Sequence, residues 1–161
     1  MNAKRKQTQA GFSLLEMVVV MVVGGIVIAA MGLTIRTADR NSKEGSALHR
    51  MLTDLRYAQE VAVAENRQVD FTVSAGDNAY YVTYASGGFL SNPMGGYSMY
   101  VRMNYDQYKG VNITYGTGTL SFSRTGEPRF SGAFLSSAQI VATLNNHRSI
   151  RINPQGYSFI Q

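Results

Sequence analysis

An uncharged apolar segment near the N-terminus constrains this chain more than any other feature. Residues 17–35 carry no charged side chain over 19 residues. A helix rises about 1.5 Å per residue, so this segment is just long enough to cross a hydrocarbon core of about 30 Å. Lys4, Arg5 and Lys6 precede it, and the positive-inside rule therefore keeps the N-terminus in the cytoplasm. We expect a single-pass membrane protein whose remaining chain lies across the membrane.

Two simpler interpretations compete with this one. A secretory signal peptide has an apolar region of roughly 7–15 residues and a small-residue cleavage site. Here the run is longer, and Ile28-Ala29-Ala30 is only a passable cleavage site. A plain signal anchor gives no role to Glu16, the one charge at the start of the segment. Carboxylates that enter lipid are costly and usually paired, although an interfacial carboxylate that snorkels to water is the alternative.

The residues around Glu16 resemble a known processing signal. Gly11-Phe12-Ser13-Leu14-Leu15-Glu16, after a short basic leader, is similar to the signal of type IV pilins and pseudopilins. The resemblance implies that a prepilin peptidase cuts between Gly11 and Phe12 and N-methylates the Phe12 amine. It also implies that Glu16 meets the Phe12 amine of a neighbouring subunit in the membrane, where each charge relieves the desolvation of the other.

The same resemblance implies the partners of the chain. They are the prepilin peptidase, other pilin or pseudopilin subunits in a filament or tip complex, and an inner-membrane assembly platform. The processed subunit would sit in the bacterial inner membrane with its head in the periplasm and then enter a filament. No cofactor is implied.

Hydrophobic patterning divides the chain into four parts. Together with the resemblance, it leads us to expect a leader at residues 1–11, the transmembrane half of a long helix at 12–36, its amphipathic half at 37–66, and a β-rich periplasmic head at 67–161. In the amphipathic half, apolar residues recur at spacings of three and four, which is typical of one helix face; they are Leu48, Met51, Leu52, Leu55, Ala58 and Ala62. We expect one helix from about residue 12 to about residue 65, with Arg50, Asp54, Glu60 and Glu65 off its apolar face.

After residue 67 the sequence is typical of short strands. Residues 69–73 and 80–84 alternate around the turn Gly76-Asp77-Asn78, which predicts a hairpin. Further strands are expected at residues 98–104, 111–115, 119–123, 139–144, 149–152 and 156–160. Many short strands with turns between them favour an antiparallel sheet or sandwich. The fold class is therefore α+β, a pilin-like helix packed on an antiparallel β head.

Three segments of the second half resemble a narrower group, the GspH/FimT-type minor pseudopilins. They are residues 55–62 with 66–69, residues 120–128, and residues 150–157. The resemblance implies a minor pseudopilin of type II secretion, present in few copies near the filament tip, with a structural role in protein secretion. A minor pilin of a type IV pilus, acting in pilus assembly or DNA uptake, is the alternative. The chain has no cysteine, which favours secretion because minor pilus subunits often carry a disulfide.

The charge gives limited support to nucleic-acid binding. The formal charge is +5, and removing the three leader cations leaves 12 basic and 10 acidic residues, or +2. If they converge, Arg124, Arg129, Arg148 and Arg151 are candidate contacts for DNA or another polyanion. Residues 156–161 contain no arginine, so the basic C-terminal segment through which some FimT-type pilins bind DNA is missing.

The sequence predicts no catalytic, cofactor or metal site. His49 and His147 lack partners at metal-ligand spacing. The acidic residues after the helix are too scattered to suggest a pair of catalytic carboxylates. Nine of the ten tyrosines lie after residue 66, where strand propensity accounts for them more simply than an interface does. We therefore expect a substrate of a processing enzyme and not an enzyme.

Overall fold

The computed structural model describes residues 13–161 except 94, 96 and 117, and gives the backbone alone for residues 31–38. The chain forms two compact units, residues 1–39 and 40–161. Helix α1 (Leu14–Ala64) begins in the first unit and ends in the second. This agrees with the expectation of one long helix, whose expected first residue, Phe12, lies outside the described residues.

The part of α1 in the first unit has no packing partner within the chain segment that the structure describes there. Its large apolar side chains are exposed, from Val27 at 44% to Leu14 at 83%. Over the described residues, no helix combines the length and the mean hydropathy needed to cross a membrane, and the single-pass span is not confirmed.

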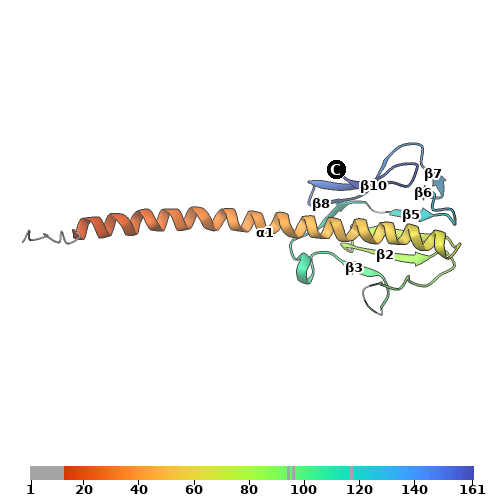
Figure 1. Ribbon diagram of the computed structural model, residues 1–161, viewed down its shortest axis with the longest axis horizontal. Helices are drawn as coiled ribbons and strands as arrows, with labels where there is room; N and C mark the ends of the chain where they lie inside the picture. The colour runs from red at the N-terminus through yellow and green to blue at the C-terminus, as the bar shows by residue number, and fades with distance from the viewer. Residues whose placement is uncertain (1–12, 94, 96, 117) are drawn as a thin grey trace, which may run out of the picture. The chain divides into compact units, whose positions relative to one another are not determined.

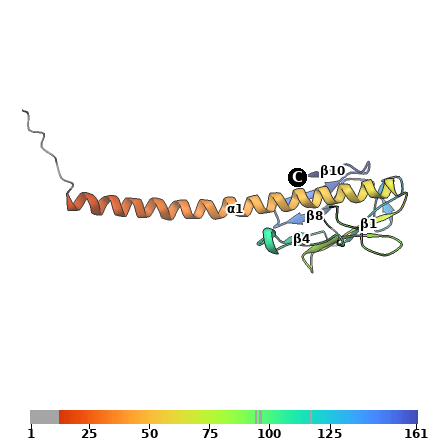
Figure 2. The ribbon, with the colours of Figure 1, turned by 60° about the horizontal axis from the view of Figure 1, so that its bottom comes forward.

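The second unit is a head in which α1 packs on two antiparallel sheets (Figure 1, Figure 2). The first sheet has the order β3 (Tyr100–Arg102), β2 (Ala79–Tyr84), β1 (Val69–Ser74), β5 (Gly118–Phe122), β6 (Pro128–Phe130), β7 (Ala133–Phe134). The second has the order β10 (Ser158–Ile160), β9 (Arg148–Ile152), β8 (Gln139–Leu144), β4 (Ile113–Tyr115). A 3₁₀ turn, η1 (Asp106–Tyr108), lies between β3 and β4.

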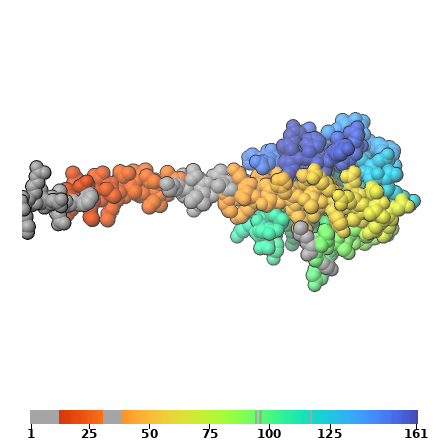
Figure 3. Space-filling view, in the orientation of Figure 1, coloured from red at the N-terminus to blue at the C-terminus, as the bar shows by residue number. Residues whose placement is uncertain are grey.

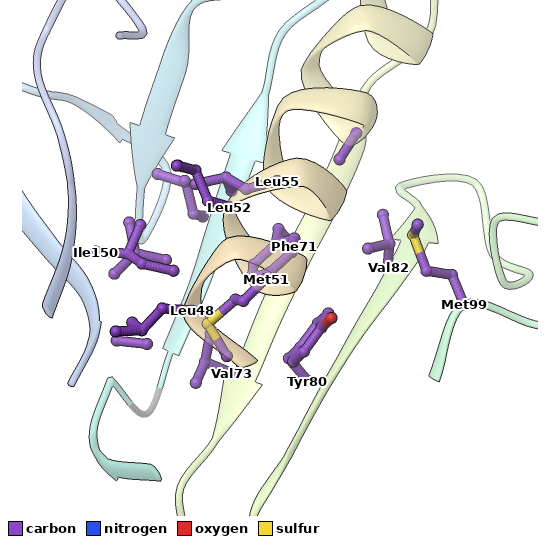
Figure 4. Close-up of a cluster of buried hydrophobic side chains, with 14 of the residues drawn as sticks. Leu48, Met51, Leu52, Leu55, Phe71, Val73, Tyr80, Val82, Met99 and Ile150 are labelled. Carbon is purple, nitrogen blue, oxygen red and sulfur yellow. The ribbon is translucent and has the colours of Figure 1, made fainter. Parts of the chain in front are cut away.

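The core lies between the second half of α1 and the two sheets (Figure 4). Leu48, Met51 and Leu55 on the helix are fully buried, as the sequence periodicity predicted. Phe71 of β1 stacks on Tyr80 of β2 with ring centroids 5.2 Å apart. The opposite face of the helix remains at the surface, where Figure 3 shows it between segments of the two sheets.

Helix α1 ends in a defined capping motif. Asn66 has φ 52°, the left-handed conformation that asparagine tolerates at the residue after a helix. The Arg67 amide donates to the Ala62 carbonyl at 3.1 Å and the Asn66 amide to Val63 at 3.3 Å. This is the hydrogen-bond pattern of a Schellman motif. The motif turns the chain sharply into β1 and fixes the position of Arg67.

Two sequence expectations need correction. Asp54 was expected off the apolar face but is only 3% exposed, because the spacing 51, 54, 58 places it between Met51 and Ala58. Strands β6 and β7 were not expected at all. Pro128 suggested a turn, yet it stands first in β6, where proline is tolerated in a strand.

Candidate functional site

The start of α1 is capped by the residues of the processing-like motif. The Leu15 amide donates to the Ser13 hydroxyl at 3.3 Å, and the Glu16 amide donates to the Ser13 carbonyl at 3.0 Å. Ser13 is thus the N-cap and Glu16 the third helical residue, the spacing of a capping box. A carboxylate in the first turn also interacts favourably with the helix dipole.

Glu16 therefore also has the position of the acidic residue in a capping box. The sequence analysis missed this local role, although the Ser13-x-x-Glu16 spacing is its signal. Gly11 and Phe12, the expected cleavage and methylation residues, lie outside the described residues. The Glu16 side chain is exposed, so it is available to a group outside the chain. The exposed apolar residues that follow it form a surface far larger than an isolated soluble protein normally presents.

In the head, the three segments of the narrower resemblance meet at one residue, Gln59. Its amide Nε2 donates to the Gly126 carbonyl at 2.9 Å. Gly126 and Gly156 both have positive φ, 80° and 87°, and both press against the helix. A Cβ at Gly156 would stand 2.4 Å from Gln59 Nε2, and one at Gly126 would stand 2.9 Å from Val63 Cγ2. Only glycine permits these turns and this approach together.

A second contact fixes the last strand to the same stretch of helix. Arg56 donates through Nη2 to the Ser158 carbonyl at 2.9 Å. The helix therefore holds the β5–β6 turn through Gln59 and β10 through Arg56. A groove of about 550 Å³ runs along these contacts and is lined by residues of α1, the β5–β6 turn and residues 156–158.

A buried polar group lies inside the head beneath the helix. The Asp54 carboxylate accepts hydrogen bonds from Arg50 Nε at 2.8 Å and from the Tyr80 hydroxyl at 2.6 Å. Burial, and then the Asp54 charge, raise the pKa of Tyr80 well above its ordinary value. Burial lowers the pKa of Arg50, but the hydrogen bond and charge of Asp54 outweigh it and raise that pKa. The group is an ion pair with a phenol donor, and its role is structural.

A chain of asparagines joins α1 to three loops. The amide of Asn145 donates to the buried Glu44 carboxylate at 3.2 Å, and its oxygen accepts from the Asn112 amide at 3.0 Å. Asn78 donates to the Asn112 side chain at 3.2 Å and accepts from the Ile113 amide at 2.6 Å. Asn78 and Asn145 both have φ near 50°. The network ties the β1–β2 and β8–β9 turns to the helix; the sequence predicted Asn78 as a turn residue but did not predict this network.

The four arginines predicted as polyanion contacts form two separate pairs. Arg124 and Arg129 line a cavity of about 600 Å³ together with Arg67, which the sequence did not single out. Arg148 and Arg151 lie on β9 of the other sheet. They stand three positions apart, and since side chains alternate along a strand they point to opposite faces. Neither Arg148 nor Arg151 lines the cavity that Arg124 and Arg129 share.

Metal-ligand chemistry is sparse in the described part of the chain. No group of three histidine, cysteine, aspartate or glutamate side chains there could hold a metal ion. His147 approaches the Glu44 carboxylate, with Nδ1 3.9 Å from Oε2, and His49 is exposed on α1.

Comparison with known families gives two matches on this chain. The prokaryotic N-terminal methylation motif matches residues 6–32, which include Gly11, Phe12 and Glu16. The family model of type II transport protein GspH matches residues 47–156, more than half of the chain. The second match contains Gln59, Gly126 and Gly156, which meet in the head. No curated protein and no solved structure matches the chain.

Proposed function

This chain belongs to the GspH family of type II transport proteins, and from that premise we propose that it is a minor pseudopilin of a type II secretion system. Its work is assembly: it contributes one subunit to the periplasmic filament that drives folded proteins through the outer membrane. The observation that carries the proposal is that both family matches occur in one chain and that each includes part of α1: the methylation motif covers residues 6–32, and the GspH match begins at residue 47 and continues through the strands of the head to residue 156.

The proposal includes processing of the leader. A prepilin peptidase would cut between Gly11 and Phe12 and methylate the Phe12 amine, as the match over residues 6–32 implies for this class of protein. We expect Gly11→Ala to reduce leader removal, because Gly11 is the residue before the proposed cut in the segment that matches the methylation motif. The measurement is the mass of the purified chain. Normal removal in that variant would argue against the assignment of this site.

The proposal also includes anchoring by the apolar half of α1. Residues 17–35 carry no charge, and the described apolar side chains there are exposed, which suits a helix covered by lipid or by neighbouring helices. Glu16 would then pair with the Phe12 amine of the adjacent subunit. In such surroundings each charge needs a partner, because an isolated carboxylate in lipid is costly.

A type IV pilus subunit is the second candidate function. The methylation motif fits a pilus subunit equally well. Arg124 and Arg129 line one cavity, which supports the binding of an anionic ligand. The separation of Arg148 and Arg151 on another sheet weakens extended DNA binding, which needs a basic stripe along the molecule.

A clean deletion strain distinguishes the two machines. Secreted exoenzyme activity is measured in parallel with surface pili and DNA uptake, with the wild-type chain restored from a plasmid as the control. The proposal predicts loss of exoenzymes with pili intact. Loss of pili or of transformation with secretion intact would reject type II secretion in favour of the pilus.

A further inference from the structure

Three arginines converge on one cavity at the end of the head where α1 stops. Arg67 follows the helix, Arg124 lies in the β5–β6 turn, and Arg129 lies on β6. Residues far apart in sequence thus bring three guanidinium groups to a space of about 600 Å³. We call this space the arginine cavity. Glu127 is an acid in its lining.

Two of the guanidinium groups are held in place by aromatic rings. The Arg67 carbon Cζ lies 4.0 Å from the centroid of the Tyr84 ring, and Arg129 Cζ lies 4.1 Å from that of Phe134. Arg67 also donates to the Ser86 hydroxyl at 2.8 Å and stands 3.6 Å from Glu65. A guanidinium stacked on a ring keeps in-plane donors available for a further ligand.

Arg129 has binding capacity that its own chain does not use. Its Nε is buried and has no hydrogen-bond partner among the described residues. A buried donor without a partner is costly, so Arg129 Nε lacks the acceptor that a buried guanidinium normally has.

The turn that carries Arg124 is rigid. The Ser123 hydroxyl accepts from the amides of Thr125 at 3.3 Å and Glu127 at 3.1 Å, and the Gly126 amide donates to the Ser123 carbonyl at 2.9 Å. Gln59 holds the same turn from the helix side. The backbone on either side of Arg124 is therefore held in place before a ligand binds, which reduces the entropy lost on binding.

From these contacts we propose that the arginine cavity binds carboxylate groups from an acidic segment of a neighbouring filament subunit. Planar forks of N–H donors match carboxylates in a bidentate manner. Three guanidinium groups with one opposing lining acid suit a short acidic segment. Arg148 and Arg151, on β9, do not line this cavity, and a compact cluster of three arginines suits a short carboxylate segment better than the extended stripe that a nucleic acid needs. This inference rests on the proposed function, because that function supplies the neighbouring subunit.

The test uses the full chain in detergent and two short probes. One probe is a fluorescent hexaglutamate peptide and the other is a single-stranded DNA oligonucleotide of equal charge. The variant R67Q/R124Q removes two exposed cations from the cavity. The matched control, R102Q/K109Q, removes two exposed cations elsewhere on the head. It changes the net charge by the same amount as R67Q/R124Q and leaves the leader unchanged. Circular dichroism confirms that both variants fold.

We expect R67Q/R124Q to weaken hexaglutamate binding by about tenfold, as loss of charge-assisted bidentate contacts would. The control should stay within about twofold, because distant exposed charges are screened by salt. The variant R67K/R124K keeps the charge and loses the fork, and it should bind several-fold more weakly than wild type. Equal losses in the cavity and control variants, full binding by the lysine variant, or cavity-dependent binding of the oligonucleotide alone would each overturn the proposal.

A cellular measurement separates this inference from the proposed function. In the deletion strain, wild type and R67Q/R124Q are compared for exoenzyme secretion and for co-isolation with the other filament subunits. The inference predicts that the variant co-isolates poorly while wild type does not. If wild type restores secretion and the variant co-isolates equally well, the inference fails and the proposed function stands. If deletion leaves secretion intact, the proposed function fails, whatever the peptide measurement shows.

Discussion

The two halves of α1 share one backbone geometry and differ in what covers them. In the first half, apolar residues surround the helix, and Val18 and Val22 remain about half exposed at 49% and 57%. In the second half, apolar residues follow one face, and Leu48 and Leu55 are fully buried beneath two sheets. The second half completes its packing within the chain, whereas the described apolar side chains of the first half stay exposed, which fits the proposed cover by lipid or by other subunits.

The largest expected effect comes from removing a core contact of the second half. Leu55→Ala should lower the free energy of unfolding of the head by about 3–4 kcal/mol through lost burial and a residual cavity. Val22→Ala in the first half should leave head stability unchanged, because Val22 is exposed at 57% and belongs to the other compact unit. Urea denaturation in detergent, followed by circular dichroism, measures both. Equal effects of the two variants would contradict the division of the helix.

A smaller loss is expected at the buried polar group. Asp54→Ala removes the shared acceptor of Arg50 and Tyr80 and should lower the free energy of unfolding by about 2–3 kcal/mol. This value is at or below the low end for a broken buried ion pair, because Arg50 keeps some solvent access. Glu60→Ala, an exposed acid on the same helix, should change it by less than about 0.5 kcal/mol. If Asp54→Ala left the free energy of unfolding unchanged, Asp54 would not be fixing the helix on β2.

The glycine contacts at Gln59 should contribute less. Gly156→Ala places a Cβ against Gln59 Nε2 and displaces the hydrogen bond from Gln59 to Gly126. Gly132→Ala has a similar φ, 84°, with open space around it, and therefore measures the backbone strain alone. We expect Gly156→Ala to be about 1 kcal/mol less stable than Gly132→Ala. If the two variants had indistinguishable unfolding midpoints, the Gln59 side chain would be moving away from the new Cβ with no loss of stability.

The effect with the narrowest range is on the pH dependence of stability, because it is confined to alkaline pH. Because the pKa of Tyr80 is raised in the folded head, its contribution is complete below the unfolded pKa of about 10 and is lost as the pH rises above that value. Tyr80→Phe should remove a slope of at most about 1.4 kcal/mol of unfolding free energy per pH unit above pH 10. Identical slopes for wild type and variant between pH 9 and 11 would refute this role; these pH limits bracket the ordinary pKa of tyrosine, about 10.

Much of the fold was predictable because it follows from the local periodicity of apolar residues. The spacing of Leu48, Met51 and Leu55 predicted the buried helix face, and the alternation around Gly76-Asp77-Asn78 predicted the β1–β2 hairpin. The strand β6 escaped prediction because Pro128 is a turn signal in sequence and an allowed first strand residue in space.

The sites were less predictable because they depend on contacts between distant residues. The three resembling segments could be recognised singly, but nothing local shows that Gly126 and Gly156 both meet Gln59. Arg67 joins Arg124 and Arg129 only because the Schellman motif after Ala64 turns the chain toward the β5–β6 turn. Asp54 was misplaced because a charged residue suggests a solvent face, whereas here Arg50 and Tyr80 satisfy it inside.

Substitution of Glu16 tests the central claim, that the two halves of α1 serve different partners, most directly. Wild type and Glu16→Ala are expressed in the deletion strain and compared for leader removal, unfolding of the purified chain, and co-isolation with the other filament subunits. The account predicts normal leader removal, an unchanged unfolding midpoint of the head, and loss of co-isolation. Undiminished co-isolation would contradict it, because the first half of α1 would then not need Glu16 to find its partners.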